Sequence, residues 1–307
     1  MCEFVPDFLI LGAQKAGTTA LSAYLEQHPE IFIPRNKEPS FFSFKSKHPE
    51  YCGPEDWLAN RDFVVHQDAY SQLFHPRGPQ QIAGEASVTY LYLADTVRNI
   101  KYFIPKAKFI VSLRNPAKRA FSAYQHLRRD GREVIGNFSD ALEAESERIG
   151  KNWETLWHYE SVGYYGKQIE RYLDVFSRDQ FLFLKSEEIF NDPLESLERC
   201  FEFLEVDTSF VPDTSFEMNV SGAPKSQRLN DFFNKPNPIK ETFKKFIPIK
   251  FGRRIKNAIQ KKNLEKSESI GEDDYMNLIS RYTRDIQLTE QLTGLNLSNW
   301  YSQDFDS

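Results

Sequence analysis

The sequence has little cysteine, and its cysteines lack the spacing of a metal site. Cys2, Cys52 and Cys200 are far apart and form no Cys-x-x-Cys pair, which is typical of a protein from a reducing compartment. The N-terminus lacks the basic start and apolar run of a signal peptide. No stretch approaches the roughly 20 apolar residues that span a bilayer. These absences predict a cytoplasmic protein without a transmembrane segment or a structural zinc site.

A strong net charge is also missing. The 307 residues carry 39 Lys and Arg against 44 Asp and Glu, a net charge of −5, so a general nucleic-acid binder is disfavoured and we expect no nucleic-acid partner. Twenty-six Phe and fourteen Tyr supply apolar surface for a folded core. We therefore expect a single domain over residues 1–307, with a basic, helical C-terminal region from about residue 225 to 307.

Positive charge is concentrated within that C-terminal region. Ten of the 27 residues from 240 to 266 are Lys or Arg, and they alternate with apolar residues such as Phe243, Phe246 and Ile255. The pattern favours an amphipathic helical cap whose polar face is solvated. The alternative is a patch for a polyanionic acceptor or for peripheral contact with a membrane.

Short apolar runs alternate with helical patterns along the chain. Phe8 to Leu11 and Lys108 to Leu113 have the continuous apolar character of strands buried in a parallel sheet. Thr18 to Gln27 carries a helical stripe of apolar residues, and a second helix is expected from an Asn115 N-cap and Pro116 to a stop at Gly131.

The alternation continues further along. The patterns predict helices at Tyr165 to Phe176 and Asp192 to Leu204, and a strand at Gln180 to Lys185. Strands that alternate with helices imply βαβ units. We therefore predict a three-layer α/β fold with a central parallel sheet and helices on both faces.

The loop after the first strand has the glycine spacing of a phosphate loop. Gly12 and Gly17 match the two glycines of G-x-x-x-x-G-K-[ST], but the next residue is Thr18 instead of lysine. In kinases and NTPases that lysine reaches the β- and γ-phosphates, and the hydroxyl after it binds Mg²⁺. Here the only lysine of the loop is Lys15. The loop therefore predicts an anion site that differs from that of a nucleotide kinase.

A second anion site is expected where the Lys108 to Leu113 strand ends. Arg114 follows the strand, and Ser122 lies in the next helix. A guanidinium can make bidentate contact with a phosphate, and a serine hydroxyl can add another hydrogen bond. A magnesium site would need a carboxylate where Arg114 stands, and Glu85 is the one acidic candidate elsewhere. We therefore expect no metal.

Four segments, in order and spacing, resemble the sulfotransferases that use 3'-phosphoadenosine 5'-phosphosulfate (PAPS). The resemblance is strongest to the heparan sulfate N- and 3-O-sulfotransferase branch and its bacterial relatives. The segments are Gly12 to Leu21, Lys37 to Phe42, Gly84 to Ser87, and Leu113 to His126. The resemblance implies a fold like that of P-loop nucleotide enzymes, and PAPS as the sulfuryl donor.

The resemblance also implies which residues hold the donor. The 5'-phosphosulfate would be held by the loop residues Lys15, Ala16, Gly17, Thr18 and Thr19. The 3'-phosphate would be bound by Arg114 and Ser122. Tyr164 matches the aromatic residue beside the adenine, and Lys225 falls in a basic loop that closes over the donor.

Catalytic roles follow from the same resemblance. Glu38 matches a carboxylate that acts as general base on the acceptor, and His126 matches a functional histidine of the N-sulfotransferase branch. Lys15 would stabilise charge on the bridging oxygen during a metal-independent, in-line transfer to a hydroxyl or amine. Two other classes stay open: a P-loop kinase or NTPase, and a non-catalytic protein that binds PAPS or a polyanion.

One departure bears on the acceptor. The heparan-modifying enzymes carry a lysine where this chain has Ala86, between Glu85 and Ser87. In those enzymes the lysine contacts the donor sulfonate or the acceptor. Its absence argues against heparan sulfate itself, although a carbohydrate or glycolipid acceptor remains the expectation.

Overall fold

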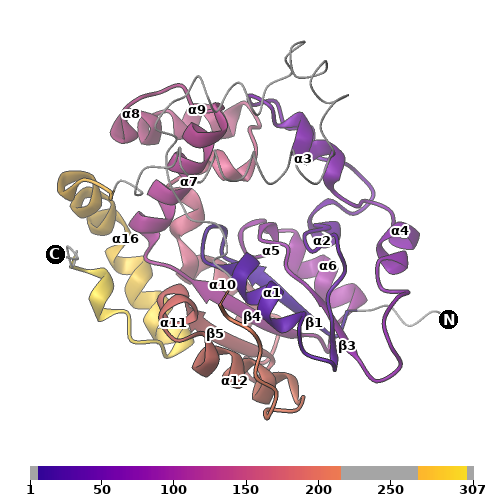
Figure 1. The fold of residues 1–307 in the computed structure, drawn as a ribbon. Coiled ribbons are helices and arrows are strands. Elements are labelled where there is room, and N and C mark those ends of the chain that lie inside the picture. Colours follow the sequence, from indigo (N-terminus) through magenta and orange to yellow (C-terminus); the bar gives the residue numbers. More distant parts are fainter. Residues whose placement is uncertain (1–5, 216–268, 303–307) are drawn as a thin grey trace, which may run out of the picture.

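A five-stranded parallel sheet forms the centre of the molecule (Figure 1). The structure, a computed structural model, describes residues 6–215 and 269–302. The strands are β1 (Phe8–Gly12), β2 (Ile31–Phe32), β3 (Ile82–Glu85), β4 (Lys108–Leu113) and β5 (Phe181–Lys185), in the spatial order β2-β3-β1-β4-β5. Every described pair is parallel. The carboxyl ends of the strands therefore meet at one edge of the sheet.

Helices connect these strands and follow the last of them, β5. They are α1 (Thr18–Leu25), α2 (Phe41–Phe44), α3 (Trp57–Asp62), α4 (Gln67–Gln72), α5 (Thr89–Tyr92), α6 (Thr96–Phe103), α7 (Pro116–Asp130), α8 (Phe138–Glu143), α9 (Glu145–Gly150), α10 (Tyr165–Leu173), α11 (Ser186–Asn191), α12 (Pro193–Leu204) and α16 (Glu272–Thr293). Figure 1 shows α3, α8 and α9 apart from the sheet. Within the described ranges, no helix has the length and apolar character needed to cross a membrane.

Alternate residues of the strands enter two separate cores. Phe8 and Ile10 of β1 belong to a cluster with residues of α1 and α12, such as Leu21 and Phe201. Leu9 and Leu11 belong to a larger cluster that includes residues of α5, α7, α10 and α16. Because successive strand residues face opposite sides of a sheet, the two clusters are its two covered faces. The predicted three-layer α/β fold is confirmed.

The predicted elements agree with the structure except at some ends. The strand Lys108–Leu113 and the helix after Asn115 have the expected bounds, and Gly131 ends that helix with φ 75°. Asn115 Oδ1 accepts hydrogen bonds of 3.1 Å from the backbone N–H groups of Ala117 and Lys118. Helix α10, by contrast, ends at Leu173 instead of Phe176.

Asn115 also joins the second βα junction to the C-terminal part of the chain. Its Nδ2 donates to Tyr275 Oη of α16 at 2.8 Å and to the carbonyl of Trp300 at 3.2 Å. Helix α16 packs against both α7 and α10. Lys225 and the basic segment 240–266 lie outside the described residues.

Gly84 offers a test of the close approach between β1 and β3. A Cβ atom on Gly84 would lie 2.1 Å from the Phe8 ring, which is fully buried. We expect Gly84→Ala to lower the free energy of unfolding by about 1–3 kcal/mol, because a packed ring cannot retreat without cost. The measurement is urea denaturation. Gly136→Ala is the matched control, since nothing lies within 4 Å of its Cβ position; equal stability of the two variants would contradict this account of the packing.

Candidate active site

The loop after β1 is fixed to the neighbouring strand β4. The Ala13 N–H donates to the Ser112 carbonyl at 2.6 Å, and Ser112 Oγ donates to the Ala16 carbonyl at 2.5 Å. Lys15 and Gly17 have φ values of 69° and 85°. Gly17 adopts this left-handed conformation without steric cost, and the loop can therefore turn sharply into α1.

Helix α1 presents its N-terminus at the carboxyl edge of the sheet. Gly17 is its N-cap, and no side chain of the described residues caps its first turn. Gly17, Thr18 and Thr19 line a cavity of about 410 Å³. Unpaired N–H groups and the positive end of the helix dipole make such a terminus an anion site. The predicted phosphate loop therefore has the required geometry.

Lys15 and Arg114 are partly buried cations that meet at this loop. Arg114 Nη1 donates to the Lys15 carbonyl at 3.2 Å, and Lys15 Nζ lies 2.8 Å from His126 Nδ1. Neither cation forms an ion pair with a carboxylate among the residues the structure describes. Burial, followed by the charges of Arg129 and Arg114, lowers the pKa of Lys15 to about 8. Burial also lowers the pKa of Arg114. Two desolvated cations without a carboxylate partner are suited to an anionic ligand.

His126 orients the Lys15 ammonium through a defined tautomer. Its Nε2 lies 3.2 Å from Asp130 Oδ2, one helical turn along α7. The Asp130 carboxylate accepts the Nε2–H, so the Nδ1 lone pair is available to accept from Lys15. Burial lowers the pKa of His126, which favours this neutral form. Ser122 also lines the cavity, and it lies four residues before His126 on the same face of α7.

The cavity extends from the two strand-end loops towards α3. Its lining residues are Gln14, Lys15, Gly17, Thr18, Thr19, Ala20, Glu38, Leu58, Ala59, Asp62, Val88, Arg114, Ser122, His126, Arg132, Glu154, Leu156 and Phe190. Lys15, Glu38, Arg114, Ser122 and His126 are thus brought together from three separate segments. Sequence reasoning missed Arg132, Glu154 and the α3 residues, because no motif marks them.

Glu38 is held beside the end of β3 by two of the motif segments. The Lys37 carbonyl accepts the Ala86 N–H at 2.7 Å, and the Ser40 N–H donates to Ser87 Oγ at 2.9 Å. The Glu38 carboxylate forms an ion pair with Lys37 Nζ. The segments Lys37 to Phe42 and Gly84 to Ser87 therefore form one structural unit beside the cavity.

Glu85, the acidic candidate for a magnesium ligand, supports this unit instead. Its carboxyl group accepts hydrogen bonds from Ser87 Oγ at 2.7 Å, Tyr90 Oη at 2.5 Å and Tyr70 Oη at 3.2 Å. The side chain is fully buried, and burial raises its pKa to about 7. Among the described residues, no group of three or more His, Cys, Asp or Glu is placed to hold a metal ion.

Aromatic residues near the loop are placed differently from expectation. Tyr164 does not line the cavity: its hydroxyl donates to Glu160 at 2.7 Å and its ring packs against Tyr282. Phe190 of α11 is the aromatic residue among the described lining, and its ring lies 3.2 Å from the Cβ position of Gly17. Its side chain is 56% exposed, so a ring face is open to a ligand. No motif signals Phe190, although it follows β5 as Arg114 follows β4.

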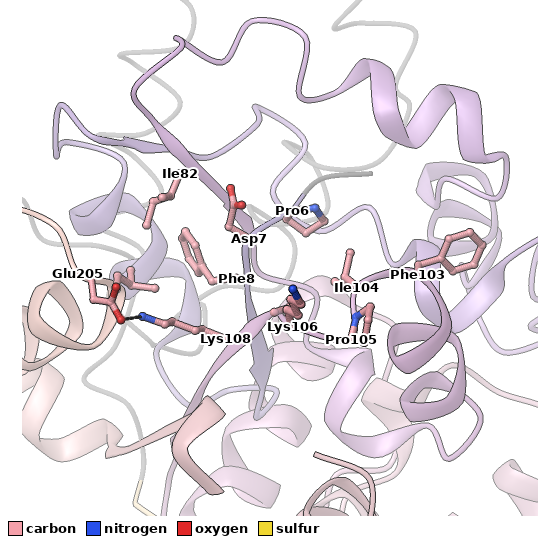
Figure 2. Close-up of a pocket in the computed structure, with 12 residues that line it drawn as sticks. Pro6, Asp7, Phe8, Ile82, Phe103, Ile104, Pro105, Lys106, Lys108 and Glu205 are labelled. Carbon is pink, nitrogen blue, oxygen red and sulfur yellow. Dashed lines mark hydrogen bonds and ion pairs between the residues drawn. The ribbon is translucent and has the colours of Figure 1, made fainter. Parts of the chain in front are cut away.

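A second cavity, of about 420 Å³, lies at the opposite edge of the sheet (Figure 2). Phe8, Ile82 and Lys108 line it at the amino ends of β1, β3 and β4. Lys108 pairs with Glu205 at 2.7 Å, the ion pair drawn in Figure 2. Ligands of open α/β sheets bind at the carboxyl ends of the strands. The first cavity is therefore the candidate active site.

Comparison with known proteins identifies relatives over most of the chain. The family described as "Sulfotransferase domain" matches residues 5–270. The human bifunctional heparan sulfate N-deacetylase/N-sulfotransferase 2 is 30% identical over 209 residues, which are 66% of this chain and 22% of that protein. The mouse enzyme 4 of the same name is 30% identical over 213 residues, or 67% of this chain and 23% of that protein. The chain thus spans less than a quarter of the curated relatives it matches.

A solved bacterial structure matches almost the whole fold. The sulfotransferase from Alicyclobacillus acidocaldarius is 35% identical and superimposes with a TM-score of 0.75. The match covers 97% of this chain and 99% of that one. The similarity therefore extends over nearly the whole length of both chains.

The lowered pKa of Lys15 predicts how anion binding depends on pH. Lys15 is charged below about pH 8 and loses its charge as the pH rises through that value. We expect the affinity for 3',5'-diphosphoadenosine to fall about tenfold for each pH unit above 8, since binding then requires uptake of a proton. Calorimetric titration between pH 7 and 9.5 measures this. Lys15→Arg should remove the dependence, because a guanidinium stays charged; a flat wild-type profile would contradict the role of Lys15.

Proposed function

The chain belongs to the sulfotransferase domain family, and we propose that it transfers a sulfuryl group from PAPS to a hydroxyl or amine of an acceptor. The observation that carries the proposal is the pair of partly buried cations, Lys15 and Arg114, at the carboxyl ends of β1 and β4. PAPS has two anionic groups, the 5'-phosphosulfate and the 3'-phosphate, and the site offers two anion loops. We propose that residues 1–307 form one such domain.

In this proposal each loop binds a different anionic group of the donor. Lys15, Ala16, Gly17, Thr18 and Thr19 hold the 5'-phosphosulfate at the α1 N-terminus. Arg114 and Ser122, which both line the cavity, bind the 3'-phosphate that distinguishes PAPS from ATP.

The adenine has two candidate partners. Tyr164 retains the role that the family resemblance gives it, and Phe190 is supported by its open ring at the cavity. An aromatic ring stabilises a stacked base by about 1–3 kcal/mol. Lys225 remains proposed as part of a loop that closes over the donor.

PAPS supplies an activated sulfuryl group to this site. Glu38 takes the proton of the acceptor O–H or N–H while the acceptor atom forms a bond to sulfur and the bond from sulfur to the bridging oxygen breaks. Lys15 and the α1 N-terminus stabilise the charge that develops on the leaving phosphate. His126 holds the Lys15 ammonium and is the alternative base. The products are the sulfated acceptor, 3',5'-diphosphoadenosine and a protonated base.

A carbohydrate or glycolipid is the proposed acceptor. Support comes from the relatives, whose names specify heparan sulfate N-sulfation. The basic segment 240–266 is proposed as a peripheral membrane contact, which would suit an acceptor on a lipid. The cytoplasmic location proposed from the cysteine pattern also requires an acceptor that is present there.

Kinetics on two variants test the proposed chemistry. Lys15→Ala should lower kcat by about 10²–10³, since one preorganised electrostatic donor has roughly that effect on the rate. Glu38→Gln keeps the shape of the side chain and removes the base, so it should lower kcat and leave the affinity for 3',5'-diphosphoadenosine nearly unchanged. Labelled PAPS and a panel of glycans and glycolipids, read by mass spectrometry, provide the assay. Wild-type kcat in Glu38→Gln would refute Glu38 as the base.

Metal removal separates this proposal from a P-loop kinase or NTPase. Thr18 occupies the position of the kinase lysine, and cationic side chains supply the positive charge at the loop. We expect turnover to continue at an unchanged rate in excess EDTA. Loss of turnover on chelation, with recovery on addition of Mg²⁺, would favour the kinase class instead.

A further inference from the structure

The side of the cavity opposite the phosphate loop has a charge pattern of its own. We define the acceptor wall as the lining residues contributed by the segments 38–62 and 132–156 that flank the donor loops: Glu38, Leu58, Ala59, Asp62, Arg132, Glu154 and Leu156. The wall has three carboxylates, one guanidinium and three apolar side chains. If PAPS occupies the loops, as the proposed function requires, the acceptor must enter against this wall.

The guanidinium of the wall is already neutralised. Arg132 Nη2 forms ion pairs with Asp56 and, at 2.9 Å, with Glu154 Oε2. Its Nε donates to the Pro54 carbonyl at 2.8 Å. Asp56 is fully buried and also accepts from the Glu154 N–H at 2.7 Å and from Trp157 Nε1 at 3.0 Å. Arg132 is therefore held in place by contacts within the protein, and its charge is balanced by the carboxylates of Asp56 and Glu154.

The carboxylates of the wall affect one another. Burial is the main cause that raises the pKa of Glu154; Arg132 lowers it, and the nearby Asp56 and Glu38 raise it further. Another anion beside Glu154 would add to this repulsion. The two remaining cations near the wall are paired as well, Lys37 with Glu38 and Arg61 with Asp62 at 2.8 Å. Among the described residues of the wall and their immediate neighbours, no cation is left for an anionic acceptor.

Helix α3 adds apolar surface to the rim of the cavity. None of its residues is buried, and Trp57 is 59% exposed. Leu58 and Ala59, the next two residues of α3, line the cavity itself. The helix is anchored from its N-terminal side by Asp56, whose carboxylate also accepts the Gly53 N–H at 2.8 Å. An apolar rim of this kind suits the C–H face of a sugar ring.

We propose that the acceptor wall selects an uncharged sugar and rejects sugars that carry carboxylate or sulfate groups beside the reacting hydroxyl. The proposal rests on the proposed function and narrows its acceptor class. An anionic sugar would lose its hydration and meet Glu38, Asp62 and Glu154 without a compensating cation, whereas an uncharged sugar meets hydrogen-bond acceptors and apolar side chains. The wall thus acts as a filter for the acceptor, because its carboxylates repel anionic sugars.

Two tetrasaccharides of equal length test the filter. N-acetylchitotetraose is uncharged, and the heparosan tetrasaccharide carries one carboxylate per disaccharide. Their affinities are measured by calorimetry on protein saturated with 3',5'-diphosphoadenosine. Maltose and dodecyl maltoside form a second pair, which distinguishes a free sugar from a sugar on a lipid tail. We expect the uncharged tetrasaccharide to bind at least about ten times more tightly than heparosan at low salt, with the difference shrinking as salt rises.

Charge reversal identifies the residues responsible. Asp62→Lys changes an exposed residue at the C-terminal end of α3, where a basic side chain is favourable. It should tighten heparosan binding roughly three- to tenfold and leave N-acetylchitotetraose unchanged. Glu154→Gln should act in the same direction. Glu198→Lys, an exposed residue of α12 outside the cavity lining, makes the same change of net charge and should alter neither affinity.

Each outcome has a distinct meaning. Equal or tighter binding of heparosan by the wild-type protein, binding of neither tetrasaccharide, or an equal response to Asp62→Lys and Glu198→Lys would overturn the filter. Failure of the protein to bind 3',5'-diphosphoadenosine would instead overturn the proposed function. The titration with tetrasaccharide tests the filter, and the titration with 3',5'-diphosphoadenosine tests the proposed function.

Discussion

The site depends on holding two partly buried cations, Lys15 and Arg114, side by side without an ion pair to a carboxylate of the described chain. Burying a cation is costly, and two adjacent ones repel each other. The fold offsets this with backbone and imidazole acceptors: the Lys15 carbonyl receives Arg114, and His126 receives Lys15. Ser112 fixes the loop that carries Lys15 to the strand that carries Arg114. The positive charge is therefore preorganised for an anionic ligand.

The sequence predicted the donor side of the molecule because local chemistry determines it. Buried apolar runs specify β1 and β4, and the Asn115–Pro116 pair specifies the start of α7. A loop that joins a buried strand to a helix has little freedom, so glycine spacing places Lys15 in the loop that lines the cavity. Glu38 and His126, each in a segment resembling a known family, line the same cavity. These assignments of role remain proposals.

The acceptor side was not predicted, and the reason is physical. Arg132 and Glu154 come together through Asp56, a residue about a hundred positions from Glu154 in the chain. Such a charge network depends on long-range packing and leaves no local periodic pattern. The same holds for α3, which has no buried face and hence no helical stripe of apolar residues. The acceptor class consequently had to be inferred from the folded structure.

We propose that two separate anion loops together bind one 3'-phosphorylated nucleotide. Calorimetry with 3',5'-diphosphoadenosine and 5'-AMP tests it most directly, because the two ligands differ only in the group assigned to Arg114 and Ser122. One charge-assisted phosphate contact stabilises binding by on the order of 1.5–3 kcal/mol, so the diphosphate should bind at least about tenfold more tightly. Arg114→Ala should remove most of this difference. Equal affinity of the wild-type protein for the two nucleotides would contradict the account.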